Sequence, residues 1–213
     1  MNANRRRVVQ QLAVLAALTG SGAGAALAQS SGSYQTLSRP VPTDSDGQIE
    51  VIEFFHYGCP HCRDFHPLIQ AWKRELPDDV AFHAIPAIWD NAQLRSLAQL
   101  YYALERSGYL DEVEAEIFTA LQDEERPLFS EKDVSQWLAE FDTVDRDAVI
   151  DTYNSFAVRG LVQRADQVAR AYRVQGVPQM AVAGRYITSA SMSGSHENTL
   201  RVVDQLIARE RTG

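Results

Sequence analysis

The segment VIEFFHYGCPHC, residues 51–62, determines the fold class and contains the only two cysteines of this 213-residue chain, Cys59 and Cys62. Its first half is a nearly continuous run of apolar residues that includes β-branched and aromatic side chains, a pattern typical of a buried central strand. The residues after Cys62 carry apolar side chains at helical spacing. The C-x-x-C motif is therefore expected where a strand leads into the N-terminus of a helix.

That position favours redox chemistry for the two cysteines. The free N–H groups and the positive dipole end of a helix N-terminus stabilise a thiolate and lower the pKa of the thiol. Two cysteines this close can pass electrons as a dithiol/disulfide couple without a cofactor. A structural disulfide or half of a metal site is the alternative interpretation. Zinc needs four ligands and the sequence has no second C-x-x-C or H-x3-H pair, so we expect no metal and no cofactor.

The N-terminus has the features of a secretory signal peptide. Three arginines at residues 5–7 precede an apolar stretch at residues 8–18, and the motif ALA follows at residues 26–28. We expect cleavage after Ala28, which makes residues 1–28 the signal peptide. The apolar stretch is too short and too interrupted to predict a membrane anchor. The sequence leaves open whether export follows the general secretory or the twin-arginine route.

The charge of the chain excludes several classes of partner. The full chain has a net charge of −8, and removal of residues 1–28 takes away three arginines and no acid, which moves the charge to −11. This acidic balance argues against nucleic acid and against an anionic membrane surface, and we expect a monomer. One cysteine pair in an exported chain predicts an oxidising compartment.

The pattern of apolar residues predicts an α/β fold with a helical insertion. Strand and helix patterns alternate up to residue 85, helical spacing alone continues from residue 90 to about 164, and strands return after Gly176. We therefore expect one domain over residues 29–213, interrupted by helices at about 90–164. The expected strands are residues 34–37, 49–55, 80–85, 180–183 and 185–187. The expected helices are residues 62–76 with a kink at Pro67, 91–108, 110–121, 130–141, 145–174 with a bend at Gly160, and 196–209.

Several segments together resemble the DsbA family of periplasmic thiol:disulfide oxidoreductases, which have a thioredoxin-like fold. They are EFF at residues 53–55 leading into CPHC at 59–62, NSFAV at 154–158, GVP at 176–178 and VAGRY at 182–186. The resemblance implies a thioredoxin-like fold interrupted by an inserted helical domain. It also implies a periplasmic enzyme that donates its disulfide to reduced, unfolded exported proteins. Reoxidation would come from a quinone-linked membrane partner of the DsbB type.

The residues of the C-P-H-C motif have separate expected roles. Cys59 should be the exposed sulfur that a substrate thiolate attacks, and Cys62 the shielded sulfur that leaves and later resolves the mixed disulfide. Pro60 suits the first helical turn, where a missing N–H costs nothing. His61 can place an N–H or an imidazolium near the Cys59 thiolate, which stabilises the reduced state and makes the disulfide a stronger oxidant.

Glu53 lies six residues before Cys59 inside the apolar strand. It is either a solvated edge carboxylate or a partly buried acid with a raised pKa that moves the proton of Cys62. Its position matches the buried acid of the family. In relatives a lysine on the neighbouring strand helps to set this acid, and residues 80–85 contain no lysine.

The dipeptide Val177-Pro178 matches the cis-proline dipeptide that faces the disulfide in the family. In that arrangement the backbone of Val177 would pair with an extended substrate chain by β-augmentation. An ordinary trans bond at the start of a strand is the alternative.

Three other functions compete with a dithiol oxidase. A disulfide isomerase or reductase of the same superfamily usually carries an N-terminal dimerisation domain, and residues 29–48 are too few to form one. A binding protein with a structural disulfide would lack a reactive thiol. A metallochaperone would bind metal only in its reduced form.

Overall fold

The strand-to-helix junction at residues 51–62 forms as the sequence predicts. The computed structural model describes residues 32–45 and 47–212, and the expected signal peptide, residues 1–28, lies outside the described residues. Strand β2 (Ile49–Phe55) leads through a short loop into helix α1 (Pro60–Lys73). Val51 and Phe54 of β2 and Phe65 of α1 are fully buried, so both elements that meet at the junction are anchored in the core, while Pro60 and His61 between them are exposed.

Strand β2 is an interior strand of a five-stranded sheet with the order β1-β5-β4-β2-β3. It pairs in parallel with β3 and antiparallel with β4. The other strands are β1 (Gln35–Thr36), β3 (Val80–Pro86), β4 (Gln179–Val182) and β5 (Tyr186–Thr188). Segments from both ends of the chain therefore complete one sheet, as the alternating pattern predicts.

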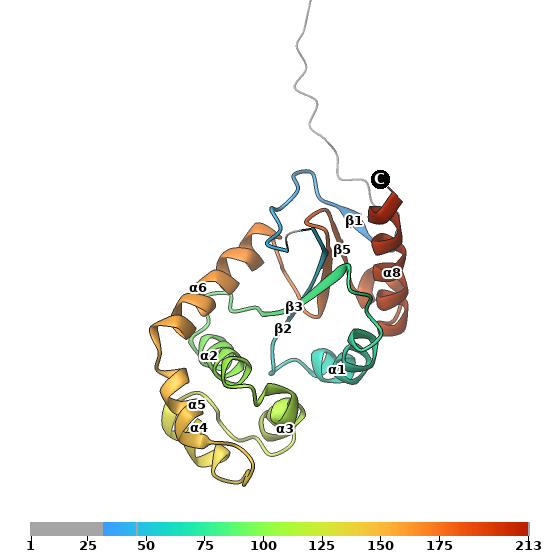
Figure 1. The fold of residues 1–213 in the computed structure, drawn as a ribbon. Coiled ribbons are helices and arrows are strands. Elements are labelled where there is room, and N and C mark those ends of the chain that lie inside the picture. Colours follow the sequence, from blue (N-terminus) through green and yellow to red (C-terminus); the bar gives the residue numbers. More distant parts are fainter. Residues whose placement is uncertain (1–31, 46, 213) are drawn as a thin grey trace, which may run out of the picture.

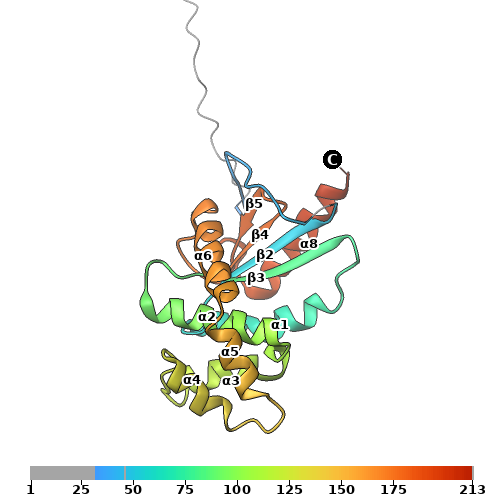
Figure 2. The ribbon, with the colours of Figure 1, turned by 60° about the vertical axis from the view of Figure 1, so that its left-hand side comes forward.

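Helices cover both faces of the sheet (Figures 1 and 2). Helices α1 and α8 (His196–Thr212) pack on one face, where Val51 contacts apolar residues of both helices. Helix α6 (Phe156–Ala171) lies on the other face, where Ile52 and Phe54 meet its C-terminal end. Successive residues of a strand point to opposite faces, so this division follows from the sequence of β2.

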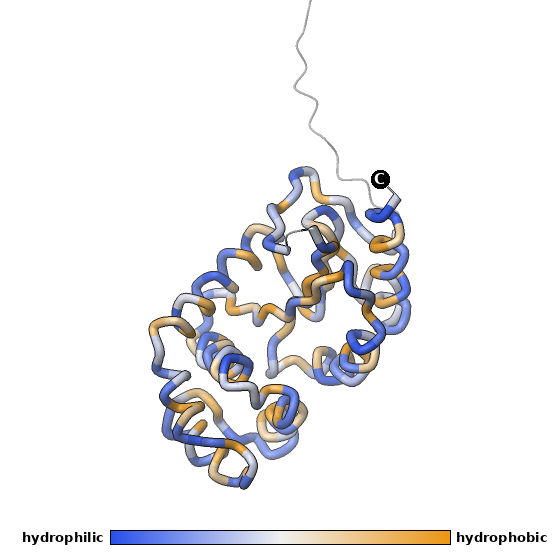
Figure 3. The backbone as a smooth tube through the Cα atoms, viewed as in Figure 1, coloured by the Kyte–Doolittle hydropathy of each residue, from blue (hydrophilic) through white to orange (hydrophobic). Residues whose placement is uncertain are grey.

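A block of helices lies between β3 and β4 in the sequence and beside the sheet in space (Figure 1). Its members are α2 (Ala92–Ser107), α3 (Leu110–Gln122), α4 (Glu131–Leu138) and α5 (Arg146–Tyr153), joined by the first half of α6. Along these helices hydrophobic and hydrophilic residues alternate (Figure 3), as expected for helices that pack on one side. Their apolar cluster includes Cys59 and Cys62, so the block packs directly against the cysteine motif. The exact limits of the insertion, about 90–164, stay a prediction.

The single long helix expected over residues 145–174 is wrong. The chain forms two helices that break at Asn154 and Ser155, while Gly160 lies within α6. Ser155 has an extended backbone and its side chain accepts a hydrogen bond from the N–H of Val158, which is the geometry of an N-cap. A short helix, α7 (Ala190–Ser193), was also not expected. Helix α1 continues through Pro67 for six more residues, to Lys73.

None of the helices within residues 32–45 and 47–212 combines the length and the apolar character needed to cross a bilayer.

Candidate active site

The two cysteines lie at the N-terminus of α1 and differ in accessibility. Cys59 occupies the N-cap position with an extended backbone, and Pro60 begins the helix. The cysteines are in the dithiol form, and Cys59 retains 9 % exposure while Cys62 retains 1 %. Cys59 is therefore more accessible than Cys62, as predicted, but much less exposed than the sequence suggested, because the helical block packs around it.

The environment separates the pKa values of the two thiols. A hydrogen bond from the Cys62 side chain is the main cause that lowers the pKa of Cys59 to about 6; backbone N–H groups and the charge of His61 add to it, while burial opposes it. Burial raises the pKa of Cys62, and its hydrogen bond to Cys59 raises it further. Near neutral pH the reduced pair therefore consists of a Cys59 thiolate and a Cys62 thiol.

The dipeptide Val177-Pro178 lies beside Cys59, 118 residues away in the sequence. The Val177–Pro178 bond is cis, so the ordinary trans bond considered above is excluded. The Sγ of Cys59 lies 3.5 Å from the carbonyl oxygen of Val177, to which it donates a hydrogen bond when it is protonated. An open groove of about 1190 Å³ runs past this point, and its walls include His61, Val177, Pro178 and Met192. Val177, which contacts the sulfur, thus lines an open groove that suits an extended peptide.

Glu53 is buried within the sheet, 7 % exposed, opposite Ala84 of β3 and Met180 of β4. A solvated edge carboxylate is therefore excluded. Burial is the main cause that raises the pKa of Glu53 to about 8; the charge of Glu114 raises it further, and Lys73 of α1 opposes both. A lysine does act on this acid, but it comes from the helix and not from the neighbouring strand.

His61 lies near a second histidine that the sequence analysis did not single out. The ring centroids of His61 and His196 are 6.3 Å apart, and His196 stacks on Phe65 of α1. Both histidines line the groove beside Cys59. The start of α8 thus contributes to the surface around the cysteine motif.

The helical block supplies two groups to the site that the sequence analysis missed. Gln122 at the end of α3 donates from Nε2 to the carbonyl oxygens of Tyr57 at 2.7 Å and Cys59 at 3.2 Å. Glu114 of the same helix is buried and accepts a hydrogen bond from the Tyr57 hydroxyl. A signal for Glu114 existed, because it falls on the apolar stripe of its helix, four residues from both Leu110 and Phe118.

A metal-binding cluster is absent from the described part of the chain, where three or more His, Cys, Asp or Glu nowhere come together in a suitable arrangement. The site thus consists of a thiol pair, a buried acid, and a cis-proline platform beside a groove. These groups can exchange thiols and disulfides using the cysteines alone.

Comparison with known proteins gives consistent results. The family model described as a DSBA-like thioredoxin domain matches residues 69–199. The thiol:disulfide interchange protein DsbA of Bordetella parapertussis is 40 % identical over 190 residues, which cover 89 % of this chain and 90 % of that protein. The protein of the same name from Pseudomonas aeruginosa is 37 % identical over 207 residues, 97 % of each chain.

A crystal structure of Pseudomonas aeruginosa DsbA superimposes with a TM-score of 0.81 at 39 % identity, covering 84 % of this chain and 93 % of that one. The α/β thioredoxin-like fold predicted from the sequence is confirmed.

Proposed function

This chain belongs to the DsbA family of thiol:disulfide interchange proteins, and from that premise we propose that Cys59 and Cys62 are the residues with which it oxidises substrate thiols. The observation that carries this assignment is the asymmetry of the pair. The more accessible Cys59 has a pKa lowered to about 6, whereas burial raises the pKa of Cys62. A disulfide whose outer sulfur leaves as a stable thiolate is a strong oxidant. A low thiol pKa paired with an oxidising disulfide is already well known for DsbA, so this link is general to the family and not particular to this chain.

The reaction consists of two thiol:disulfide exchanges. A substrate thiolate attacks Sγ of Cys59, the Cys59–Cys62 bond breaks, and Cys62 leaves with the electron pair and takes up a proton. A second substrate thiolate then attacks the substrate sulfur of the mixed disulfide, and Cys59 leaves as a thiolate. The substrate loses two electrons and the protein gains them, so no cofactor is required for this half of the cycle.

Pro60 and His61 tune the reactivity of Cys59. Pro60 begins α1 without requiring a backbone donor, and the backbone N–H groups of His61 and Cys62 that follow it help to lower the pKa of Cys59. The charge of His61 contributes to the low pKa of Cys59. Both residues favour the thiolate, and therefore the reduced form.

Val177 and Pro178 form the substrate platform. The carbonyl oxygen of Val177 lies within hydrogen-bonding reach of the Cys59 sulfur, and the groove continues past both residues. An extended substrate segment would form main-chain hydrogen bonds with the Val177 backbone and place its cysteine against Cys59. Binding of this kind depends little on the amino-acid sequence of the substrate. Glu53 exchanges the proton of Cys62 during each exchange.

As a member of its family the protein acts on substrate proteins. We extend this to a periplasmic monomer, exported with residues 1–28 as its signal peptide. Its substrates would be reduced, unfolded exported proteins, and a quinone-linked membrane protein of the DsbB type would return it to the disulfide form. The acidic net charge, −11 without residues 1–28, supports this because it disfavours nucleic acid and anionic membrane surfaces.

A peptide with two reduced cysteines tests the assignment. The oxidised protein should convert the peptide to its disulfide in stoichiometric amounts. The Cys59→Ser variant should produce none, and the Cys62→Ser variant, oxidised as a mixed disulfide at Cys59, should transfer its partner to the peptide without closing a protein disulfide. A peptide that stays reduced with the parent protein, or that Cys59→Ser still oxidises, would overturn the proposal.

A structural disulfide and an isomerase remain the competing functions. A structural disulfide does not require a thiol with a low pKa, so the state of Cys59 argues against it. An isomerase would restore a scrambled substrate protein when supplied in its reduced form, an assay that separates it from an oxidase.

A further inference from the structure

Glu114 is a buried acid of the helical block that the exchange described above does not use. It is 7 % exposed, and its carboxyl group contacts the elements that carry the cysteines. The hydroxyl of Tyr57 donates to Oε1 at 3.4 Å and Nε2 of Gln70 donates to Oε2 at 3.1 Å, while Nδ1 of His66 lies 3.8 Å from Oε2. Gln70 and His66 belong to α1, and Tyr57 belongs to the loop before it. An acid of α3 is thus held against the redox helix.

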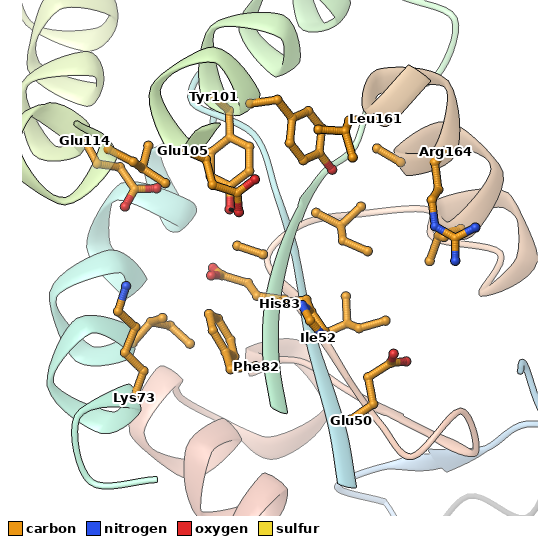
Figure 4. Close-up of a pocket in the computed structure, with 18 of the residues that line it drawn as sticks. Glu50, Ile52, Lys73, Phe82, His83, Tyr101, Glu105, Glu114, Leu161 and Arg164 are labelled. Carbon is orange, nitrogen blue, oxygen red and sulfur yellow. Dashed lines mark hydrogen bonds between the residues drawn. The ribbon is translucent and has the colours of Figure 1, made fainter. Parts of the chain in front are cut away.

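Glu114 and Glu53 line one cavity of about 480 Å³ between the sheet and the helical block. In Figure 4 the carboxyl group of Glu114 enters the cavity from α3, and the ammonium group of Lys73 reaches toward it from α1. Asp111 also lines the cavity and its side chain is 82 % exposed, so the cavity reaches the surface. A polar cavity of this size has room for several water molecules, which can carry protons between carboxyl groups.

Near neutral pH Glu53 is mostly protonated, whereas Glu114 is close to the midpoint of its titration. Burial raises the pKa of Glu53 to about 8 and that of Glu114 to about 7, and Lys73 lowers both. The charge of Glu114 also raises the pKa of Glu53. The other titratable or charged groups that line the cavity are His66 from α1, Tyr101, Tyr102 and Glu105 from α2, Asp111 from α3, His83 from β3, Glu50 from β2, Arg164 from α6, and Asp44 and Tyr172. Within the described residues none of these groups is hydrogen-bonded to Glu53. Glu114 is the acid whose charge raises the pKa of Glu53.

We propose that Glu114 is a positioning residue for Glu53, and that the two carboxyl groups act as one pair that exchanges the proton of Cys62 with the surface through this cavity. The proposal rests on the proposed function, because the proton on Cys62 changes only when the cysteine pair is oxidised and reduced. It gives the helical block a part in the redox step in addition to its packing against the cysteines.

The proton balance of the cycle defines what the pair does. When substrate opens the disulfide, Cys62 leaves as a thiolate and takes the proton of Glu53. The Glu53 carboxylate regains a proton from Glu114, and Glu114 regains one from solvent. Of the two protons that the substrate thiols release, one replaces the proton now on Cys62 and the other stays in solvent, because Cys59 remains a thiolate. Reoxidation runs the same transfers in reverse.

The direct test is a carbon-13 NMR titration of the Glu53 carboxyl carbon in the oxidised protein, where no thiol titrates. In the Glu114→Gln variant, which keeps one carbonyl oxygen that can still accept from Tyr57, the midpoint of Glu53 should fall by about one pH unit or more. Glu114→Asp should keep the high midpoint, because it keeps the charge. Glu116→Gln is the matched control, since Glu116 is an exposed acid on the same helix, and it should leave the midpoint unchanged. An unchanged midpoint in Glu114→Gln overturns the proposal.

The parent protein provides a second measurement that needs no variant. Coupled acids titrate in two steps that both carbons report, so the Glu53 and Glu114 signals should each show the inflection of the other. A one-step titration of Glu53 would contradict the pair.

A kinetic readout tests the proton transfer itself. The rate at which Cys62 resolves a mixed disulfide at Cys59 with glutathione should depend on the ionisation of the pair, so Glu114→Gln should move this pH profile to lower pH. A profile that does not move while the NMR midpoint shifts overturns the transfer role. Failure of the proposed function would give a different result. The parent protein would not oxidise the dithiol peptide, but the titrations of Glu53 and Glu114 would still be coupled.

Discussion

Replacement of Glu53 by glutamine should stabilise the oxidised protein, and more so as the pH rises. Glu53 is buried in the sheet, and burial raises its pKa from 4.5 to about 8. In the unfolded chain the same carboxyl group is solvated and ionises near its ordinary pKa. The native state therefore binds a proton that the unfolded state releases between these two values, and its stability falls with increasing pH over that range.

The magnitude follows from the two pKa values. A group whose native pKa is raised contributes stability below its unfolded pKa and loses it as the pH rises toward its native pKa. At pH 7 the solution lies 2.5 units above 4.5 and still below 8, so retention of Glu53 costs about 3 kcal/mol relative to its neutral form. At pH 5 the cost is below about 1 kcal/mol. Glutamine has nearly the same shape and no proton to release, so it removes this dependence.

Denaturant unfolding of the oxidised proteins at pH 5, 6, 7 and 8 measures the effect without interference from thiols. The difference between Glu53→Gln and the parent should rise by roughly 1.4 kcal/mol per pH unit over the middle of this range. Glu116→Gln, an exposed acid changed in the same way, should stay within about 0.5 kcal/mol of the parent at each pH. A gain for Glu53→Gln that is equal at pH 5 and pH 8, or a loss, would refute the burial argument.

Three further predictions concern the groups around the cysteine motif. Gln122→Ala removes both hydrogen bonds to the loop carbonyls and should cost about 1–3 kcal/mol in urea unfolding, whereas the exposed Gln163→Ala should be nearly neutral; equal effects would contradict the role of Gln122. Ser155→Ala removes the N-cap of α6 and should cost about 1 kcal/mol, which Ser155→Asp should restore; no loss in the alanine variant would count against the cap. His61→Gln removes a charge that lowers the pKa of Cys59, so iodoacetamide alkylation of Cys59 should move to higher pH, and an unmoved profile would exclude His61 as a tuning residue.

The sequence was most informative where local chemistry and tertiary structure agree. The apolar run of β2 and the helical spacing after Cys62 predicted the junction that carries the cysteines, because a buried strand and an amphipathic helix leave different patterns. The break between α5 and α6 was not predicted, because the sequence suggested one helix with only a bend at Gly160. A glycine inside a helix is tolerated when the helix packs well, whereas a serine in extended conformation ends one helix and caps the next.

The electrostatics of the site depended on contacts between distant segments. Glu114 follows the cysteines by more than fifty residues, and only the packing of α3 on α1 places it near Glu53. The sequence also suggested that the acid in β2 lacked a lysine, because β3 has none and the lysine that acts on Glu53, Lys73, lies on α1. The low exposure of Cys59 has the same origin, since the helical block packs around it. Sequence spacing shows which residues share an element but not which elements meet.

A stable thiolate on Cys59 of the reduced protein is central to the proposed oxidase function. Thiolate absorbance of the reduced protein should therefore titrate with a midpoint near pH 6, far below that of an ordinary cysteine. The Cys59→Ser variant should lose this transition, and Cys62→Ser should keep one, since its hydroxyl can still donate to the thiolate. A midpoint near that of free cysteine, or a low transition that survives in Cys59→Ser, would contradict the account.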